Sequence, residues 1–356
     1  MSITRCGWIN LKVFLSLVVA VPLLVWHRHF PVTASDTTEP AIVALSISPM
    51  NPHYATVRQN GLVEIVDYQT GVVINTYTIP LPFQDVNNLN PTGYNVVDIA
   101  YSPLGNPIAV VIADISISGI IYLLDWETGE VRPAYNQTYL RRINDIGWSP
   151  DGNRIVLALQ DGGADQLILS RIAILNVTTG EMERTLLDAE SIDNYAVTVV
   201  AWSASNVIGY ANRSELILWD ATTSMELGSL SASDEIYDAV WDPQENRIAT
   251  LNDDRTIQVW DVSSTPFALE QTWQVRSDRL RSRGMSWIGE NILAVNLWTD
   301  VEVWNVTDAT LEGVIESDLF VNGLGALPNN EILIAGPQSV TAYQVLSETS
   351  TPTPES

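Results

Sequence analysis

The strongest constraint on the fold of this chain is an internal repeat with a period of about 40 to 50 residues. Each copy opens with a three-residue marker, in which an aromatic or apolar residue is followed in the first five copies by Ser or Asp and in the best copies by Pro; the last two copies keep less of the pattern. The seven copies are Ile47-Ser48-Pro49, Tyr101-Ser102-Pro103, Trp148-Ser149-Pro150, Trp202-Ser203-Ala204, Trp241-Asp242-Pro243, Trp287-Ile288-Gly289 and Ala326-Leu327-Pro328. Such a period is typical of folds that repeat one small structural unit.

A second marker follows each copy of the first one. Its best copies are Trp219-Asp220 and Trp260-Asp261. Three more, each followed by a Thr-Gly turn, are Val66-Asp67, Leu124-Asp125 and Leu175-Asn176, and the last two are Trp304-Asn305 and Tyr343-Gln344. The two markers alternate seven times without a gap, an order that chance matches would not keep.

The sequence between the markers has the pattern of short β-strands. Residues 248–251 are mostly apolar, residues 252–255 form a polar turn, and residues 256–260 alternate between polar and apolar side chains. Alternation on both sides of a turn cluster is typical of a hairpin. We therefore expect four strands in each repeat, and a helix only in the N-terminal hydrophobic segment.

These markers resemble those of the WD-repeat family over residues 41–346. The resemblance implies an all-β, seven-bladed β-propeller of four-stranded antiparallel blades around a central channel, assigned to residues 29–346. It also implies that an N-terminal strand completes the last blade, and residues 32–36 resemble residues 230–234 at the end of an outer strand. The Gly-His pair of many family repeats is absent, so the chain is a divergent relative. Residues 347–356, rich in Ser, Thr and Pro, are expected to be a disordered tail.

The first 28 residues are predicted to form a signal peptide or an N-terminal membrane anchor. Arg5 and Lys12 precede an apolar run over residues 13–26, which is shorter than the roughly 20 residues of a typical span. Cleavage after Ala34 would remove half of the expected closing strand. Two outcomes remain open, a membrane-anchored protein facing outward and a secreted or periplasmic one.

The composition limits the chemistry that this chain can carry. Its formal charge of −25 disfavours nucleic acid as a partner. Cys6 is the only cysteine and His53 the only histidine after residue 29, so a cysteine nucleophile and a zinc site rich in His or Cys are excluded from the repeats. No phosphate-binding loop or nucleotide motif occurs. We expect no cofactor and no enzymatic activity.

One set of charged residues is a candidate interaction face. Asp98, Asp145 and Asp238 each lie three residues before the marker aromatic, which predicts that they meet near the mouth of the channel. Six arginines lie in the loops that enter two inner strands: Arg141, Arg142, Arg276, Arg279, Arg281 and Arg283. They could bind a partner that carries carboxylates. The alternative is structural, with ordinary repeat positions and weak surface ion pairs.

The sequence therefore predicts a non-enzymatic, extracytoplasmic scaffold that binds protein partners. Two alternatives remain, a propeller hydrolase or lyase that uses acidic residues at the channel mouth, and a propeller that binds Ca²⁺ or a small ligand. The insertion at residues 161–165 has too few local oxygen ligands for Ca²⁺ and is expected to be a surface loop. Two of four glycosylation-like sequons, at Asn176 and Asn305, fall in turns and are interpreted as turn chemistry.

Overall fold

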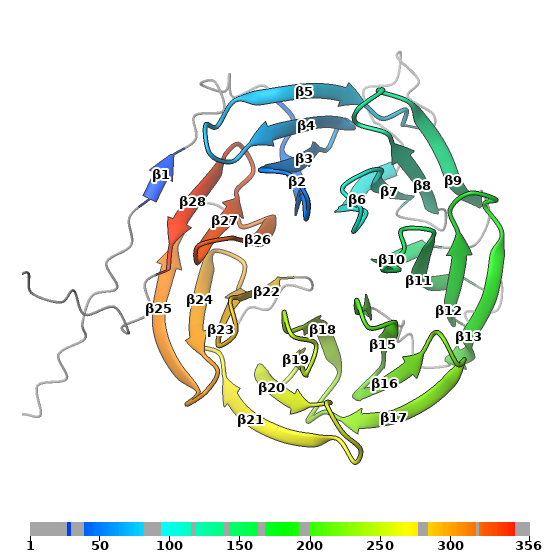
Figure 1. Ribbon diagram of the computed structural model, residues 1–356, viewed down its shortest axis with the longest axis vertical. Helices are drawn as coiled ribbons and strands as arrows, with labels where there is room; N and C mark the ends of the chain where they lie inside the picture. Colours follow the sequence, from blue (N-terminus) through cyan, green and yellow to red (C-terminus); the bar gives the residue numbers. More distant parts are fainter. Residues whose placement is uncertain are drawn as a thin grey trace, which may run out of the picture.

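The fold is a ring of seven four-stranded antiparallel sheets around a central channel (Figure 1). The computed structural model describes residues 27–29, 39–81, 94–114, 119–137, 142–162, 168–191, 199–276, 284–317 and 320–345. This arrangement confirms the predicted all-β, seven-bladed propeller. The predicted N-terminal helix and the C-terminal tail lie outside the described residues.

Each blade is numbered here in chain order, and its four strands run from the channel to the outer wall. In blades 1 to 3 they are β2 (Ile42–Ile47), β3 (His53–Arg58), β4 (Leu62–Asp67) and β5 (Val73–Thr78); β6 (Tyr94–Tyr101), β7 (Ile108–Asp114), β8 (Gly119–Leu124) and β9 (Val131–Gln137); and β10 (Arg142–Trp148), β11 (Arg154–Gly162), β12 (Ile168–Asn176) and β13 (Met182–Ser191). In blades 4 and 5 they are β14 (Val200–Trp202), β15 (Val207–Asn212), β16 (Glu215–Asp220) and β17 (Met225–Ser231); and β18 (Ile236–Trp241), β19 (Arg247–Asn252), β20 (Thr256–Asp261) and β21 (Ala268–Gln274). Blade 6 holds β22 (Met285–Ile288), β23 (Ile292–Asn296), β24 (Asp300–Asn305) and β25 (Thr310–Glu316), and blade 7 holds β26 (Gly323–Leu327), β27 (Glu331–Ala335), β28 (Val340–Gln344) and β1 (His27–His29).

The hydrophobic core lies between neighbouring blades. Strand β3 is buried along its whole length, whereas the outer strand β5 is largely exposed. One core cluster joins Val111 and Ile121 of blade 2 to Ile155 and Leu157 of blade 3. A fully buried aliphatic side chain of this kind contributes about 1.5–3 kcal/mol, so the stacking of blades is the main source of stability.

The blades give the ring two different faces. The turn between the first and second strands and the turn between the third and fourth strands lie at the same end of a blade, because the Tyr68 amide donates to the Pro52 carbonyl at 3.0 Å. We call this end the lower face. The upper face is formed by the turns between the second and third strands and by the connections between blades. The end of β5 and the start of β6 lie on the upper face, as do the end of β21 and the start of β22.

The first marker works as a link between blades. The indole Nε1 of Trp148 donates to the Ala100 carbonyl of the preceding blade at 3.2 Å, and Trp287 makes the same bond to Val240 at 3.2 Å. The second marker forms a turn, because Asp220 Oδ1 accepts the amides of Thr222 and Thr223 at 2.7 and 3.0 Å. The first marker makes this link in blades 3, 5 and 6, whereas the Trp202 indole donates to Asn206 within blade 4.

The ring is closed by a strand from the N-terminal region, as the resemblance implied. Strand β1 pairs antiparallel with β28, with His27 opposite Tyr343 and His29 opposite Thr341. This strand precedes the stretch expected from the sequence, residues 32–36, which lies outside the described residues. A three-residue strand has no alternation that a sequence pattern could detect, so its position is set by the open edge of β28.

Candidate functional site

The central channel forms a cavity in the described part of the molecule. It has a volume of about 980 Å³ and is lined by residues of the innermost strands. Asp98, Arg142, Asp145 and Asp238 lie on its wall, so the structure brings together four of the nine residues of the predicted interaction face.

The channel aspartates sit at β-bulges, and Asp145 and Asp238 connect neighbouring blades. Register shifts occur immediately before Asp98, Asp145 and Asp238. Asp145 Oδ2 accepts the Val200 amide of blade 4 at 3.0 Å. Asp238, which is 8% exposed, accepts the amides of Gly284 and Met285 of blade 6 at 2.8 and 2.9 Å. These bonds assign Asp145 and Asp238 a structural task.

Replacing Asp238 by alanine should lower the free energy of unfolding by about 2–3 kcal/mol, because two amides at the start of blade 6 would lose a charged acceptor. Asp238→Asn keeps one acceptor oxygen and should cost less. Denaturant titration of the three proteins measures the difference. An unchanged unfolding midpoint in Asp238→Ala would contradict the structural assignment.

The six predicted arginines are only partly described. Arg142 is exposed at the start of β10, where it lines the channel. Arg276 is exposed after β21, and its backbone amide donates to Glu302 at 3.0 Å. Arg141, Arg279, Arg281 and Arg283 lie outside the described residues. The described ends of β9, β10, β21 and β22 lie on the upper face.

An aromatic pair on the upper face was not found from the sequence. The rings of Trp298 and Phe320 meet edge to face with centroids 5.0 Å apart, and Phe320 is 46% exposed. Trp298 has a φ of 78°, which is uncommon for a bulky side chain. Its conformation is held by neighbours, since its amide donates to Asn296 Oδ1 and its carbonyl accepts the Val321 amide. Trp298 and Phe320 come from different turns, so only the packing of blades 6 and 7 brings them together.

The histidine of the repeats is buried between blades 1 and 2. His53 is 4% exposed, its Nδ1 lies 2.9 Å from the Tyr101 hydroxyl, and its ring meets Trp126 edge to face. Burial lowers the pKa of His53, and the nearby Asp67 carboxylate opposes this effect. The described contacts of His53 include no Ser or Cys hydroxyl or thiol that it could activate as a base. Its surroundings are those of a neutral packing residue.

Acidification should therefore destabilise the protein through His53. Its pKa in the folded chain is below the ordinary value of 6.5, so the unfolded chain binds the proton more readily and stability falls as the pH drops below about 6.5. We expect a lower unfolding midpoint at pH 5.5 than at pH 7.5, above the range in which carboxylates titrate. His53→Gln should reduce this difference. An equal pH dependence in both proteins would contradict the prediction.

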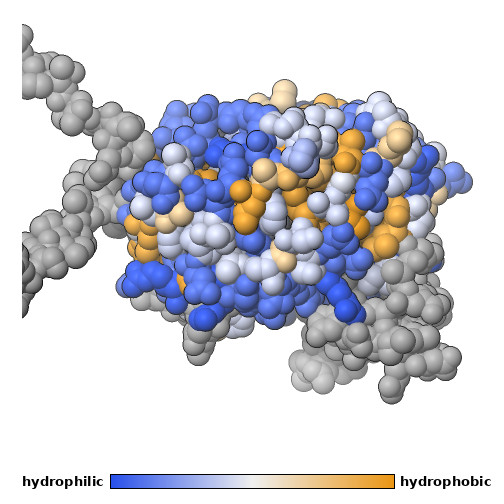
Figure 2. Space-filling model, turned by 90° about the horizontal axis from the view of Figure 1, so that it is seen from below, coloured by the Kyte–Doolittle hydropathy of each residue, from blue (hydrophilic) through white to orange (hydrophobic). Residues whose placement is uncertain are grey.

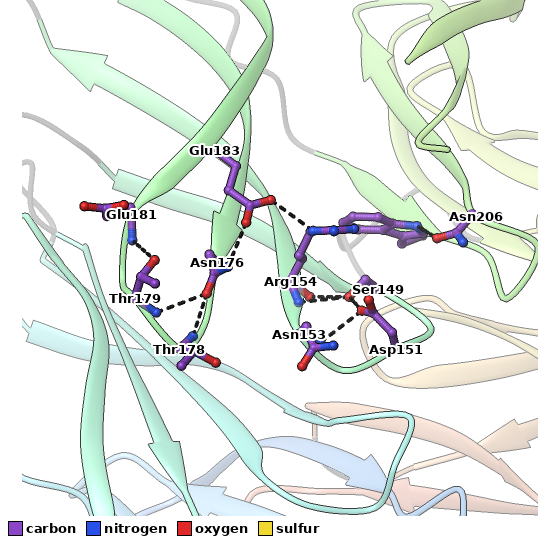
Figure 3. A network of polar contacts seen from close by, with 11 residues as sticks. Ser149, Asp151, Asn153, Arg154, Asn176, Thr178, Thr179, Glu181, Glu183 and Asn206 are labelled. Carbon is purple, nitrogen blue, oxygen red and sulfur yellow. Dashed lines mark hydrogen bonds and ion pairs between the residues drawn. The ribbon is translucent and has the colours of Figure 1, made fainter. Parts of the chain in front are cut away.

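The lower turns use their polar side chains to hold the backbone. In blade 3, Arg154 forms an ion pair with Glu183 at 2.9 Å, and Glu183 accepts a hydrogen bond from Asn176 (Figure 3). Asn176 in turn accepts the amides of Thr178 and Thr179. The sequon at Asn176 thus lies in a turn of the type expected from the sequence.

Neither a metal centre nor a membrane-spanning helix is found in the described parts of the chain. Among these residues, no three His, Cys, Asp or Glu side chains form a group that could hold a metal ion. None of the described segments forms a helix with the length and hydrophobicity needed to cross a bilayer.

Comparison with known proteins agrees with the fold. The family model for the WD domain, G-beta repeat, matches residues 225–261, which run from the outer strand of blade 4 to the third strand of blade 5. The chain is 29% identical over 140 residues to the anaphase-promoting complex subunit cdc20 of Dictyostelium discoideum, covering 37% of this chain and 27% of that protein. It is 28% identical over 112 residues to protein FIZZY-RELATED 2 of Arabidopsis thaliana, covering 31% of this chain and 22% of the relative.

The chain thus spans about a quarter of the length of these relatives. The matched repeat consists of the outer strand of blade 4 and the first three strands of blade 5. Blade 7 is completed in the same way, because its outer strand β1 comes from a different part of the chain than its other three strands. The alternating markers, the seven four-stranded blades and the matched repeat identify the chain as a divergent member of the WD-repeat β-propellers.

Proposed function

We propose that this propeller is an extracytoplasmic scaffold that binds a protein partner through its upper face and catalyses no reaction. The observation that carries the proposal is the composition of that face around blade 6. An exposed Phe320 packs edge to face on Trp298, and Arg276 is exposed at the end of β21, where its amide donates to Glu302 of blade 6. Aromatic residues and arginine are enriched at the centres of protein interfaces.

The connections between blades support the same face. Long loops on a rigid scaffold commonly carry binding residues, and all connections from one blade to the next leave from the upper face. The loop between β21 and β22 contains Arg279, Arg281 and Arg283 in a chain with a net charge of −25. A cationic loop of this kind suits a partner with exposed carboxylates.

The absence of catalysis is supported by the contacts of the charged residues in the channel. Asp145 and Asp238 are engaged by amides of the next blade, and His53 is buried against Tyr101 and Trp126. One relative is named as a subunit of a complex, which agrees with a role in assembly. The extracytoplasmic location is supported by the apolar run of residues 13–26, preceded by Arg5 and Lys12.

Alanine substitution on the upper face tests this proposal. Proteins that co-purify with the wild-type chain from its own membrane fraction are compared with those recovered by Phe320→Ala and by Leu269→Ala. Leu269 is 45% exposed on the outer wall of blade 5 and is the matched control. Loss of an interface centre costs roughly 2 kcal/mol, about 30-fold in affinity. Equal recovery of every protein by the two variants would contradict the proposal.

A further inference from the structure

Strand β1 fixes the point at which the N-terminal segment reaches the ring. His27 lies opposite Tyr343, next to the end of β28. That end belongs to the lower face, because the Gln344 side chain donates to the Asn329 carbonyl and the Val345 amide donates to Asn330. Strand β1 therefore begins at the lower face of blade 7.

Blade 7 borders a part of the lower face that is unusually apolar. Of nine large hydrophobic side chains that are exposed among the described residues, five lie at or next to the lower turns of blades 1 and 2. They are Met50, Val72, Val73, Ile74 and Leu104, with exposed fractions of 67%, 59%, 39%, 44% and 61%. The Asn322 side chain, which donates to the Ile42 carbonyl, confirms that blades 7 and 1 are neighbours.

The apolar side chains continue from one blade to the next. A Cβ atom on Gly105 would come within 3.0 Å of Met50, and one on Gly152 would come within 3.0 Å of Leu104. Both glycines have positive φ angles, of 79° and 67°. Met50 thus lies over the first turn of blade 2, and Leu104 lies over the first turn of blade 3.

The first turns of blades 7, 1 and 2 carry no charge, although the chain is strongly acidic and the outer turn of blade 2 holds Asp125, Glu127 and Glu130. The turns after the innermost strands of blades 7, 1 and 2, residues 328–330, 48–52 and 102–107, contain no charged residue. The corresponding turns of blades 3, 5 and 6 contain Asp151, Glu245 and Glu290, and the turn of blade 4, residues 203–206, is also uncharged. The uncharged turns of blades 7, 1 and 2 are adjacent to one another, whereas that of blade 4 lies between two charged turns, so blades 7, 1 and 2 offer the continuous stretch that an apolar surface can cover.

We propose that the lower turns of blades 7, 1 and 2 rest on the surface of a lipid bilayer, with Met50 and Leu104 inserted at the headgroup level. This inference rests on the membrane-anchor form of the proposed function. An anchor that ends at residue 26 leaves no spacer before β1, so the lower face of blade 7 lies at the membrane. Zwitterionic lipid is favoured, because Glu127 and Glu130 in the outer turn of blade 2 would be repelled by anionic headgroups.

Site-specific fluorescence tests the contact. In the full chain with Cys6→Ser, a single cysteine replaces Met50, Leu104 or Met225 and carries an environment-sensitive dye. Met225 is the matched control, since it is 64% exposed beside a lower turn of blade 4, on the opposite side of the ring. On phosphatidylcholine vesicles we expect a blue shift at positions 50 and 104, with quenching by nitroxide-labelled lipid, and neither effect at position 225.

The outcomes separate this inference from the proposed function. If the chain floats with the vesicles and all three positions remain in water, the bilayer contact is wrong and the anchor stands. If the chain does not float, both the anchor and the bilayer contact are wrong. Equal quenching at all three positions would also overturn the inference, because it would show no preferred face. The recovery of partners through Phe320 is independent of these results.

Discussion

Replacing Glu64 by leucine should lower the free energy of unfolding by about 3 kcal/mol, because it leaves a buried guanidinium without its closest counter-ion. Arg58 is fully buried in β3, and its Nε donates to Glu64 at 3.1 Å. Its Nη1 also donates to the Pro40 carbonyl at 3.0 Å, and its Nη2 lies 3.6 Å from Glu39. The substitution therefore weakens the point at which the chain enters blade 1.

The double variant Arg58→Met/Glu64→Leu separates the effect of the charge from that of packing. Removing both partners of a buried ion pair is often nearly neutral, so most of the lost stability should return. Urea unfolding of the wild type, the single variants and the double variant gives the coupling energy between the two residues. Additive effects would show that Arg58 is not held by Glu64.

Removal of residues 1–34 should have the second large effect, because it removes β1 and opens blade 7. The edge of β28 loses its backbone hydrogen bonds to His27–His29, each contributing about 1 kcal/mol. An open edge strand also pairs readily with other chains. We expect a lower melting temperature and the appearance of oligomers in size-exclusion chromatography.

Removal of residues 1–26 is the matched control, since it deletes the apolar run and keeps β1. Its melting temperature should exceed that of the shorter chain, and it should stay monomeric. Equal stability of the two truncated proteins would mean that β1 does not close the ring. If β1 does close the ring, cleavage after Ala34 would remove the whole closing strand, whereas the sequence predicted the loss of half of it.

The outer wall also has apolar side chains, but these provide controls and no separate site. Figure 2 shows hydrophobic residues between hydrophilic ones on the side of the ring formed by blades 4 and 5. Leu227 and Leu269 are exposed there by 41% and 45%. Both belong to outer strands and lie toward the lower ends of these strands, away from the upper face, which makes them suitable for comparison with Phe320.

The repeated features of the fold could be predicted from the sequence because each one depends on a local contact. Tryptophan recurs in the first marker because its indole can donate to a backbone carbonyl of the preceding blade, as Trp148 and Trp287 do. Aspartate recurs in the second marker because its carboxylate can accept the backbone amides of the turn that follows, as Asp220 does. Seven such copies in order were sufficient to predict the number of blades and their strands.

The features that depend on packing between distant segments could not be predicted. The positions of Asp145 and Asp238 were identified, but their partners in the next blade follow from how the blades stack. The pair of Trp298 and Phe320 joins two turns that share no motif. The closing strand was expected from the family and placed too late in the chain, since three residues carry no detectable pattern.

Photo-crosslinking in intact cells tests the central claim, binding of a protein by the upper face outside the cytoplasm, most directly. A photoreactive phenylalanine analogue replaces Phe320 in one variant and Leu269 in the other, in the otherwise unchanged chain. The account predicts a discrete crosslinked protein from position 320 alone, and digestion of that product by a protease added outside the cytoplasmic membrane. The same products from both positions, or a product from position 320 that stays protected until that membrane is broken, would contradict it.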